Sequence, residues 1–367
     1  MYKQIFLDAP NVGRHEKKYL NKAIDSGFVS TIGPFVSEFE DSFAQYLGVK
    51  KAVSTQSGTA ALHMALHELG IGSEDEVIVP ALTFVATVNP IMYVGAKPVF
   101  ADVDIHTWNI DPAEIEKKIT KKTKAILIVH LYGNPCDMDR VMKIARKYKL
   151  YVIEDATESL GATYKSKFTG TFGDFGCFSF NGNKIITTGG GGMVVGKNAK
   201  KLEHIKFLVN QARDESNGYY HPEIGFNYRM TNIEAAIGIG QLKKVDDFLK
   251  KKRLFHGIYQ EELQGIASLA FQAEYPNAHS SFWLTCVSFR KGVDIQTLQK
   301  ALKGKGVPSR RVFMPVVEFQ PYRKFKKRIC RNSHTIFDSS LCLPGSTLNT
   351  ENDIHYTCNI LKGLLRG

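Results

Sequence analysis

The chain has 367 residues, of which 43% are hydrophobic and 23% charged, as in ordinary soluble globular proteins. This composition excludes a collagen-like, coiled-coil or largely disordered chain, and no stretch approaches the 18 apolar residues of a membrane span. Lys and Arg number 48 against 36 Asp and Glu, and the net charge of +12 favours anionic partners. Without a signal-peptide pattern or paired cysteine motifs, we expect a cytoplasmic protein with reduced thiols and no membrane partner.

Short apolar strands alternate with helical patterns over the first 240 residues. In chain order, strands are predicted at residues 51–56, 76–80, 98–102, 125–130, 151–155, 176–180 and 192–195, and helices at 57–69, 83–93, 111–119 and 138–148. Apolar strands separated by helices predict a mostly parallel sheet that is covered on both faces. Ligands of such sheets bind outside the carboxyl ends of the strands.

A long helical pattern over residues 233–253 ends this alternation. Beyond it lies a mixed α/β segment with a helix at residues 295–305 and a final helix that begins at Glu351. We therefore predict two domains: a large ligand-binding domain with an N-terminal arm over residues 1–245, and a smaller α/β domain over residues 246–367.

The strongest local feature is FNGNKIITTGGGGM at residues 180–193. Lys184 precedes four glycines, which let the backbone bend closely around a bound group. In a buried site that lowers its pKa, a lysine can form a Schiff base with a carbonyl compound. Taken alone, the pattern also fits a surface turn. A Walker phosphate loop is excluded, because no G-K-[ST] follows the glycines.

Two further features predict the same kind of site. Asp155 ends the fifth predicted strand, where its carboxylate could pair with the ring nitrogen of pyridoxal phosphate or merely cap a helix. Ser57, Gly58 and Thr59 lead from a strand into a helix and offer backbone N–H groups for a phosphate, to which Ser179 could add a hydroxyl. Plain N-capping by Ser57 is the alternative. Their combination in one α/β chain indicates pyridoxal 5'-phosphate.

Seven motifs extend this pattern along the chain. They are GPFVSEFE (33–40), SGTAAL (57–62), TFVAT (83–87), HLYG (130–133), EDATESLG (154–161), GTFGD (170–174) and GFNYRMTN (225–232). In this order and spacing, the chain resembles the sugar aminotransferases of the DegT/DnrJ/EryC1/StrS family. The resemblance implies the α/β fold of fold-type-I pyridoxal-phosphate enzymes, with a mostly parallel seven-stranded sheet between helices and a smaller C-terminal α/β domain.

The resemblance also implies roles for residues around the cofactor ring. Lys184 would be the catalytic lysine that holds the cofactor as a Schiff base, and Asp155 would pair with the pyridine nitrogen. Phe84 would stack on the ring, and Glu158 would lie near its phenolic oxygen.

Other residues are expected to bind the cofactor phosphate. Gly58, Thr59 and Ser179 would hold it within one subunit. Asn227 would reach the phosphate of the neighbouring subunit, which implies a homodimer with shared active sites.

Substrate recognition is expected from two arginines. Arg229 would contact substrate or cofactor, and Arg310, within GVPSR at residues 306–310, would lie near the sugar nucleotide. With NQARD (210–214) and HPEIG (221–225), the lysine motif is similar to the subgroup that acts in bacillosamine and legionaminic acid synthesis. The resemblance thus implies amino transfer from L-glutamate to C4 of a nucleotide-linked 4-keto-6-deoxy sugar, with a UDP-linked N-acetyl sugar expected, for lipopolysaccharide or protein glycosylation.

Several alternatives stay open. C3 amination of another keto sugar nucleotide fits the same motifs, and so does a pyridoxal-phosphate-binding protein without catalysis. The dehydratase branch of the family replaces the lysine with histidine, and Lys184 argues against it. A net charge of +12 admits nucleic-acid binding, but the chain lacks an arginine-rich stripe with aromatics, a zinc finger and an RNA-recognition signature. We therefore expect no nucleic-acid partner and no metal.

Overall fold

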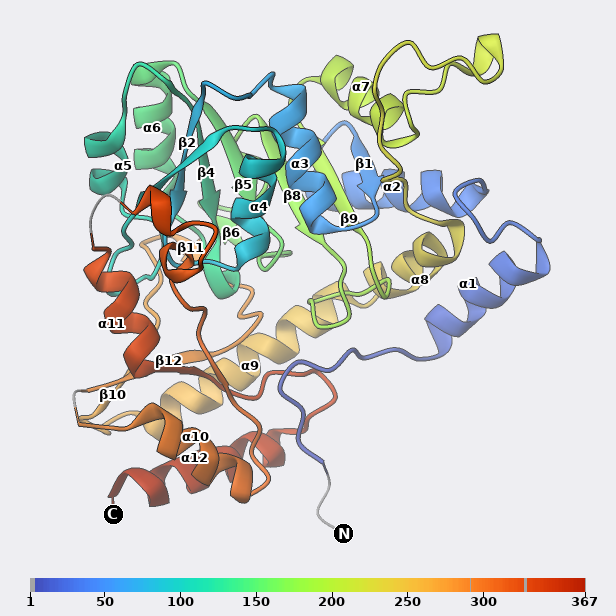
Figure 1. The fold of residues 1–367 in the computed structure, drawn as a ribbon. Coiled ribbons are helices and arrows are strands. Elements are labelled where there is room, and N and C mark those ends of the chain that lie inside the picture. The colour runs from blue at the N-terminus through green and yellow to red at the C-terminus, as the bar shows by residue number, and fades with distance from the viewer. Residues whose placement is uncertain (1–3, 291, 327–328, 367) are drawn as a thin grey trace.

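The computed structural model describes residues 4–290, 292–326 and 329–366, and its centre is a seven-stranded sheet of order β1-β9-β8-β5-β4-β2-β3 (Figure 1). The strands are β1 (Ala52–Thr55), β2 (Glu76–Pro80), β3 (Lys97–Ala101), β4 (Thr123–Val129), β5 (Tyr151–Asp155), β8 (Phe175–Ser179) and β9 (Gly192–Gly196). Strand β9 pairs antiparallel with β8 and β1, and the other pairs are parallel. The predicted mostly parallel α/β sheet is confirmed.

Helices cover both faces of this sheet. They are α1 (Arg14–Asp25), α2 (Pro34–Leu47), α3 (Gly58–Glu68), α4 (Val85–Tyr93), α5 (Pro112–Lys118), α6 (Met138–Tyr148), α7 (Ala199–Val209) and α8 (Asn232–Leu242). Ile78 and Ile126 lie in one hydrophobic cluster with side chains of α5 and α6, whereas Val77 and Leu127 lie in another with side chains of α3 and α4. Neighbouring residues of a strand point to opposite faces, so the central strands are apolar on both faces over most of their length.

The C-terminal segment adds a second, antiparallel sheet of order β10-β12-β14-β13. Its elements are α9 (Val245–Leu263), β10 (Leu269–Phe271), β12 (Cys286–Phe289), α10 (Ile295–Gly304), β13 (Arg310–Arg311), α11 (Arg331–Ser339), β14 (Ser340–Cys342) and α12 (Glu351–Arg366). Helix α9 joins the two regions: Phe248 belongs to the first core and Tyr259 to the second. A division of the chain at residue 245 stays a prediction.

Smaller elements connect these layers. They are the sheet of β6 (Thr163–Tyr164), β7 (Lys167–Phe168) and β11 (Ala278–His279), and the 3-10 turns Leu131–Gly133, Glu215–Asn217, Val316–Glu318 and Arg323–Phe325. Among the helices that the structure describes, none combines the length and apolar character of a membrane crossing. All six cysteines are buried, and none of them forms a disulfide.

Four helices that the structure describes were not predicted, and one predicted helix is wrong. The four are α1, α2, α7 and α11. The single helix expected at residues 233–253 is broken into α8 and α9 at Lys243 and Lys244. Both pieces contain buried apolar side chains, so the hydrophobic pattern continues through residues 243–244 and does not reveal the break. At the break, the Lys244 amine donates to the carbonyl oxygen of Asn11 at 3.0 Å.

The N-terminal arm crosses to the second region of the molecule. Figure 1 shows the first described residues of the chain near the start of α12 rather than beside the first strand of the large sheet. The Phe6 N–H donates to Oδ1 of Asn349 at 2.9 Å, and the Gly345 N–H donates to the Leu7 carbonyl at 2.8 Å. These bonds hold the following residue, Asp8, between the two regions.

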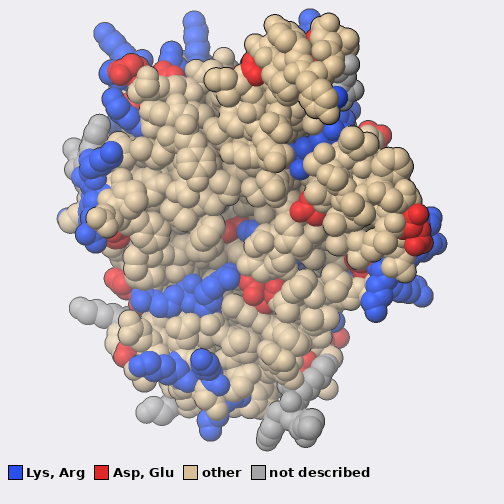
Figure 2. Space-filling model, turned by 45° about the vertical axis from the view of Figure 1, so that its right-hand side comes forward, with Lys and Arg blue, Asp and Glu red and all other residues tan. Residues whose placement is uncertain are grey.

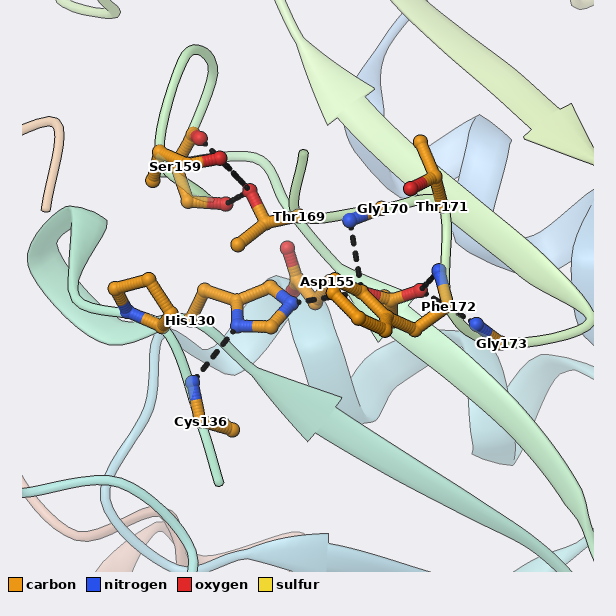
Figure 3. A network of polar contacts seen from close by, with 12 residues as sticks. His130, Cys136, Asp155, Ser159, Thr169, Gly170, Thr171, Phe172 and Gly173 are labelled. Atoms are coloured by element: carbon orange, nitrogen blue, oxygen red, sulfur yellow. Dashed lines mark hydrogen bonds and ion pairs between the residues drawn. The ribbon is translucent and has the colours of Figure 1, made fainter. Parts of the chain in front are cut away.

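A buried carboxylate fixes the end of β5. Glu154 is fully buried, and its Oε1 accepts hydrogen bonds from the N–H groups of Phe172 and Gly173 at 2.7 and 2.6 Å. Its Oε2 accepts from the Gly170 N–H at 2.7 Å (Figure 3). Gly170 has a φ of +83°, and a Cβ there would lie 2.4 Å from Cζ of Phe178. The turn that surrounds the carboxylate therefore requires glycine.

His130, which follows β4, completes this network (Figure 3). Its Nδ1 accepts from the Cys136 N–H at 3.0 Å, so the ring proton lies on Nε2, which donates to Oε2 of Glu154 at 3.0 Å. The His130 N–H donates to the Asp155 carbonyl at 3.2 Å. The ends of β4 and β5 are thus held together where Asp155 leaves the sheet.

We expect Glu154→Gln to lower the free energy of unfolding by about 2–4 kcal/mol, because an amide NH₂ would then face backbone donors without an acceptor. Urea denaturation followed by circular dichroism measures the change. Glu203→Gln is the matched control, since the Glu203 side chain is 64% exposed beside Lys51, and should cost less than about 0.5 kcal/mol. Equal costs for the two variants would contradict the role of the network.

Candidate active site

The carboxyl ends of β4, β5 and β8 lie at a cleft with an empty volume of about 880 Å³, part of which is open to solvent. Most of the predicted site residues line it: Gly58, Thr59, Phe84, Asp155, Glu158, Ser179, Lys184 and Arg310. They come from separate strand ends and helix starts, and the sheet brings them to one edge.

Lys184 lies inside this cleft with its side chain 14% exposed. Its Nζ is 3.9 Å from Oε1 of Glu158 and 4.2 Å from the centre of the Trp283 ring. Burial lowers the pKa of this amine, and the negative charges of Glu158 and Asp155 only partly oppose the shift. A larger fraction of the amine is therefore unprotonated, which is the form that attacks a carbonyl.

Asp155 is a fixed acceptor on the same side of the cleft. It is buried, its Oδ2 accepts from the Thr87 hydroxyl at 2.7 Å, and its Oδ1 accepts from the Thr157 N–H at 3.1 Å. The Thr83 and Thr87 hydroxyls lie 2.8 Å apart and extend this support. A carboxylate oriented in this way suits a protonated ring nitrogen.

Glu158 is a second buried carboxyl group. Burial raises its pKa to about 7, although the Lys184 charge and the Tyr132 N–H act in the opposite direction. The Tyr132 N–H donates to Oε2 at 2.7 Å, which leaves Oε1 facing the lysine amine. A carboxyl group with this pKa can hold or release a proton near neutral pH.

The start of α3 forms an anion-binding corner. The Ser57 hydroxyl accepts from the Ala60 N–H at 3.1 Å, so Ser57 does cap the helix. The N–H groups of Gly58 and Thr59 belong to the first turn, where no intrahelical carbonyl can accept from them. A Cβ on Gly58 would lie 2.9 Å from Cβ of Ser179, so the two segments touch here.

The glycine run after Lys184 lets β9 approach this corner. Gly191 has a φ of +107°, and its N–H donates to the Gln56 carbonyl at 2.9 Å. A Cβ on Gly192 would lie 2.5 Å from the carbonyl carbon of Ser57. Side chains at these positions would push β9 away from the start of α3.

These residues fit pyridoxal phosphate. The cleft combines an amine of lowered pKa, a buried carboxylate for the ring nitrogen and a glycine-lined helix start for the phosphate. By contrast, no group of three or more His, Cys, Asp or Glu side chains within the described ranges is arranged to hold a metal ion.

Three cleft or near-cleft residues were missed by the sequence analysis. Trp283 donates its indole N–H to the Asn183 carbonyl at 2.6 Å and covers the lysine. Phe313 lies with its ring centre 5.5 Å from that of Phe84, and Asp8 hydrogen-bonds to cleft residues. The only signal for Trp283 is its type, because the chain has just two tryptophans, and no local pattern marks Phe313 or Asp8.

Two predicted residues lie outside the cleft of their own chain. Asn227 is exposed and forms a β-bridge with Asn210, and Arg229 is half-buried. Neither lines the cleft. The role of Asn227 in a neighbouring subunit therefore stays a prediction.

The fold and the site define a pyridoxal-phosphate-dependent enzyme. Comparison with known proteins narrows this class: the model of the DegT/DnrJ/EryC1/StrS aminotransferase family matches residues 10–362, and the chain belongs to this family. The resemblance noted in the sequence is confirmed, and so is the cofactor. The protein is an aminotransferase.

Several individual proteins are similar to this chain over most of its length. The chain is 42% identical to a GDP-perosamine synthase of Escherichia coli O157:H7 over 89% of each chain. It is 41% identical to a GDP-perosamine synthase of Caulobacter vibrioides over 96% of this chain and 95% of the relative. The pyridoxal-phosphate form of the putative sugar aminotransferase Spr1654 of Streptococcus pneumoniae superposes with a TM-score of 0.94 at 26% identity, over 99% of each chain.

We expect Lys184→Ala to abolish the absorbance of the lysine-bound cofactor and to lower turnover by about 1,000-fold or more, because no other lysine among the described residues lines the cleft. Borohydride reduction of the wild-type protein, followed by peptide mapping, should place the cofactor on Lys184. Lys252 is the internal control, since it is also buried, with a pKa lowered to about 8, but lies outside the cleft. A label on Lys252 would contradict the assignment.

Glu158 should make stability depend on pH. Its pKa is about 7 in the folded protein against 4.5 in the unfolded chain, so the folded state binds this proton more tightly. Its contribution therefore favours folding at pH 4.5 and is lost as the pH rises through 7. In the cofactor-free protein, Glu158→Gln should flatten the decline in unfolding free energy over this window by about 2–3 kcal/mol. Denaturation at several pH values measures this, and the exposed Glu38→Gln should leave the profile unchanged.

Proposed function

We propose that this protein transfers the amino group of L-glutamate to C4 of a nucleotide-linked 4-keto-6-deoxy sugar, for amino sugars of bacterial surface glycans. The observation that carries the proposal is the Lys184 amine, 14% exposed and 3.9 Å from Glu158, in one cleft with the buried Asp155. Relatives named GDP-perosamine synthase support a sugar nucleotide as acceptor.

Each residue at the cofactor ring has a distinct task in this proposal. When bound, pyridoxal phosphate supplies an aldehyde that takes up the amino group and a ring that withdraws electrons. The Lys184 amine moves the proton of the donor's Cα. Asp155 stabilises the protonated ring nitrogen, because its carboxylate is held in place by Thr87 and the Thr157 N–H. Glu158 keeps a proton close to the lysine.

A second group of residues holds the cofactor in place. Gly58, Thr59 and Ser179 bind the phosphate, since the helix start offers N–H groups that have no intrahelical acceptor. Phe84 stacks on the ring. Its side chain is 53% exposed although it lies in the cleft, so an aromatic face is available there.

The acceptor we propose is a UDP-linked 2-acetamido-2,6-dideoxy-4-keto-hexose, and the names of the relatives make a GDP-linked 4-keto-6-deoxy sugar the alternative. Either acceptor carries a diphosphate, which suits a protein with a net charge of +12. On the face shown in Figure 2, Lys and Arg form separate clusters rather than one continuous basic surface. This distribution favours a small anionic substrate over a nucleic acid.

We also propose that the protein acts as a homodimer in which Asn227 and Arg229 serve the neighbouring active site. Two segments support this assembly, because they expose large apolar side chains: Phe28, Val29 and Ile32 between α1 and α2, and Tyr219, Tyr220 and Ile224 before α8. Exposed apolar patches of this kind mark protein–protein contacts.

The test is to incubate the purified holoenzyme with L-glutamate and each of the two 4-keto sugar nucleotides, and to locate the new amino group by NMR. We expect amination at C4 and stoichiometric release of 2-oxoglutarate, with the UDP-linked sugar as the preferred substrate. The Lys184→Ala protein is the control for uncatalysed amination. Amination at C3, or no sugar product at all, would contradict the proposal.

A further inference from the structure

A second cleft, here called the edge cleft, lies along the outer edge of the large sheet. It has an empty volume of about 1080 Å³, part of which is open to solvent. Its walls come from strand β3, from helix α5 and from residues 317–326 of the second region. A cleft of this size suits an organic molecule rather than a single small ion.

The edge cleft is separate from the cleft that contains Lys184. None of the described residues lines both. Phe313 lines the Lys184 cleft and Val317 lines the edge cleft. Between these two residues in the chain, the Val316 N–H donates to the Ala81 carbonyl at 2.8 Å and ties the segment to the large sheet. The edge cleft is therefore a site of its own.

The lining of the edge cleft is basic. Its charged residues are five lysines and two glutamates: Lys97, Lys117, Lys118, Lys324 and Lys326, with Glu76 and Glu114. Both carboxylates already have partners, because Glu114 pairs with Lys117 at 2.8 Å and Oε2 of Glu76 accepts from the Thr120 hydroxyl at 2.5 Å. The two glutamates therefore do not neutralise the remaining lysines.

Three ammonium groups are left without an anion. Lys97 on β3, Lys118 on α5 and Lys324 in the turn Arg323–Phe325 have no side-chain hydrogen bond or ion pair among the described residues. Lys326, by contrast, pairs with Glu318 at 2.5 Å. Like charges that converge on one cleft repel each other, and an anionic ligand removes this repulsion.

Strand β3 is an edge strand, but it is a poor template for a peptide strand. The Lys97 N–H donates to the Asp75 carbonyl at 2.9 Å, toward β2. The next residue along a strand faces the other way, so Pro98 faces the open edge, where it has no N–H to donate. Proline at this place disfavours the addition of another strand. The structure therefore favours a small anionic molecule as the occupant.

Apolar side chains beside the lysines define the rest of the ligand. Val99 and Phe325 line the edge cleft and are half-buried, so part of each stays accessible. Nζ of Lys324 lies 5.1 Å from the centre of the Phe325 ring. Lysine binds phosphate as a point charge, and an aromatic ring stacks on a planar base. A nucleoside diphosphate combines these two groups in one molecule.

We propose that the edge cleft binds a nucleoside diphosphate. Lys97, Lys118 and Lys324 surround the diphosphate, and Phe325 lies beside the base. The ligand is either a free nucleotide or a nucleotide that carries a sugar, since both have the same base and diphosphate. The inference does not depend on the proposed function, because no residue of the edge cleft takes part in amino transfer.

Lysine acetylation of the holoenzyme, measured peptide by peptide by mass spectrometry, tests the site directly. A bound diphosphate shields the amines that it contacts. Saturating UDP or GDP should slow the acetylation of Lys118 and Lys324 by about 5-fold or more. Lys121 is the matched control, since it is exposed, follows Lys118 by three residues and lines neither cleft. A nucleotide in the Lys184 cleft cannot produce this pattern.

Two variants test whether the lysines serve one ligand. In Lys118→Gln, the nucleotide concentration that half-protects Lys324 should rise by about 3- to 10-fold, because one charged contact is lost. Lys324→Gln should have the same effect on Lys118. Lys121→Gln should leave both concentrations unchanged.

Three further ligands separate the parts of the nucleotide. Pyrophosphate should need a concentration about 10-fold or more higher than UDP or GDP, because it has no base to stack. UDP-N-acetylglucosamine and GDP-mannose carry the same base and diphosphate as the free nucleotides. The form that protects at the lower concentration, free or sugar-linked, is the source of the ligand.

Four outcomes overturn the inference. They are no protection of Lys118 and Lys324 by any of these nucleotides, equal protection of Lys121, equal half-protecting concentrations for pyrophosphate and the nucleotides, and protection of one lysine that does not depend on the other. Loss of amino transfer to sugars would leave the edge cleft unaffected, so failure of the proposed function is recognised separately.

Discussion

The position of the active site depends on the Glu154 carboxylate. Successive residues of a strand point to opposite faces, so Glu154 and Asp155 leave β5 in opposite directions. On one face, Glu154 accepts hydrogen bonds from three N–H groups of residues 170–173 and from the ring of His130, which follows β4. On the other face, Asp155 opens into the cleft. The Glu154 carboxylate therefore holds together the two strand ends beside which Asp155 enters the cleft.

In the cleft itself, burial shifts the pKa values of Lys184 and Glu158 in opposite directions. Loss of water disfavours every charged form, so burial lowers the pKa of Lys184 and raises that of Glu158. The two values move toward each other while the groups lie 3.9 Å apart. The energetic cost of moving a proton from the amine to the carboxylate is therefore lower than between the same two groups in water.

The sequence was informative where structure is local. The strands of the large sheet, helices α3 to α6, and the roles suggested for Lys184 and Asp155 follow from periodicity and from short motifs, because each depends on neighbours a few residues away. Trp283 and Asp8 join the site only through packing of the second sheet and the arm, about 100 and 175 residues from Lys184 in the chain, and no local pattern encodes such contacts. The break between α8 and α9 was hidden for another reason: two amphipathic helices in sequence show one continuous periodicity.

The cleft therefore has two walls of different origin. The wall that suits the cofactor comes from one sheet and its loops, whose glycines and carboxylates tolerate little change because backbone segments touch there. The opposite wall comes from the arm and from β13, where Asp8 and Arg310 meet across more than 300 residues of chain. The two walls meet at Asn183, whose side chain donates to Asp8. Motifs of the cofactor wall consequently identify the family, whereas the opposite wall carries few motifs.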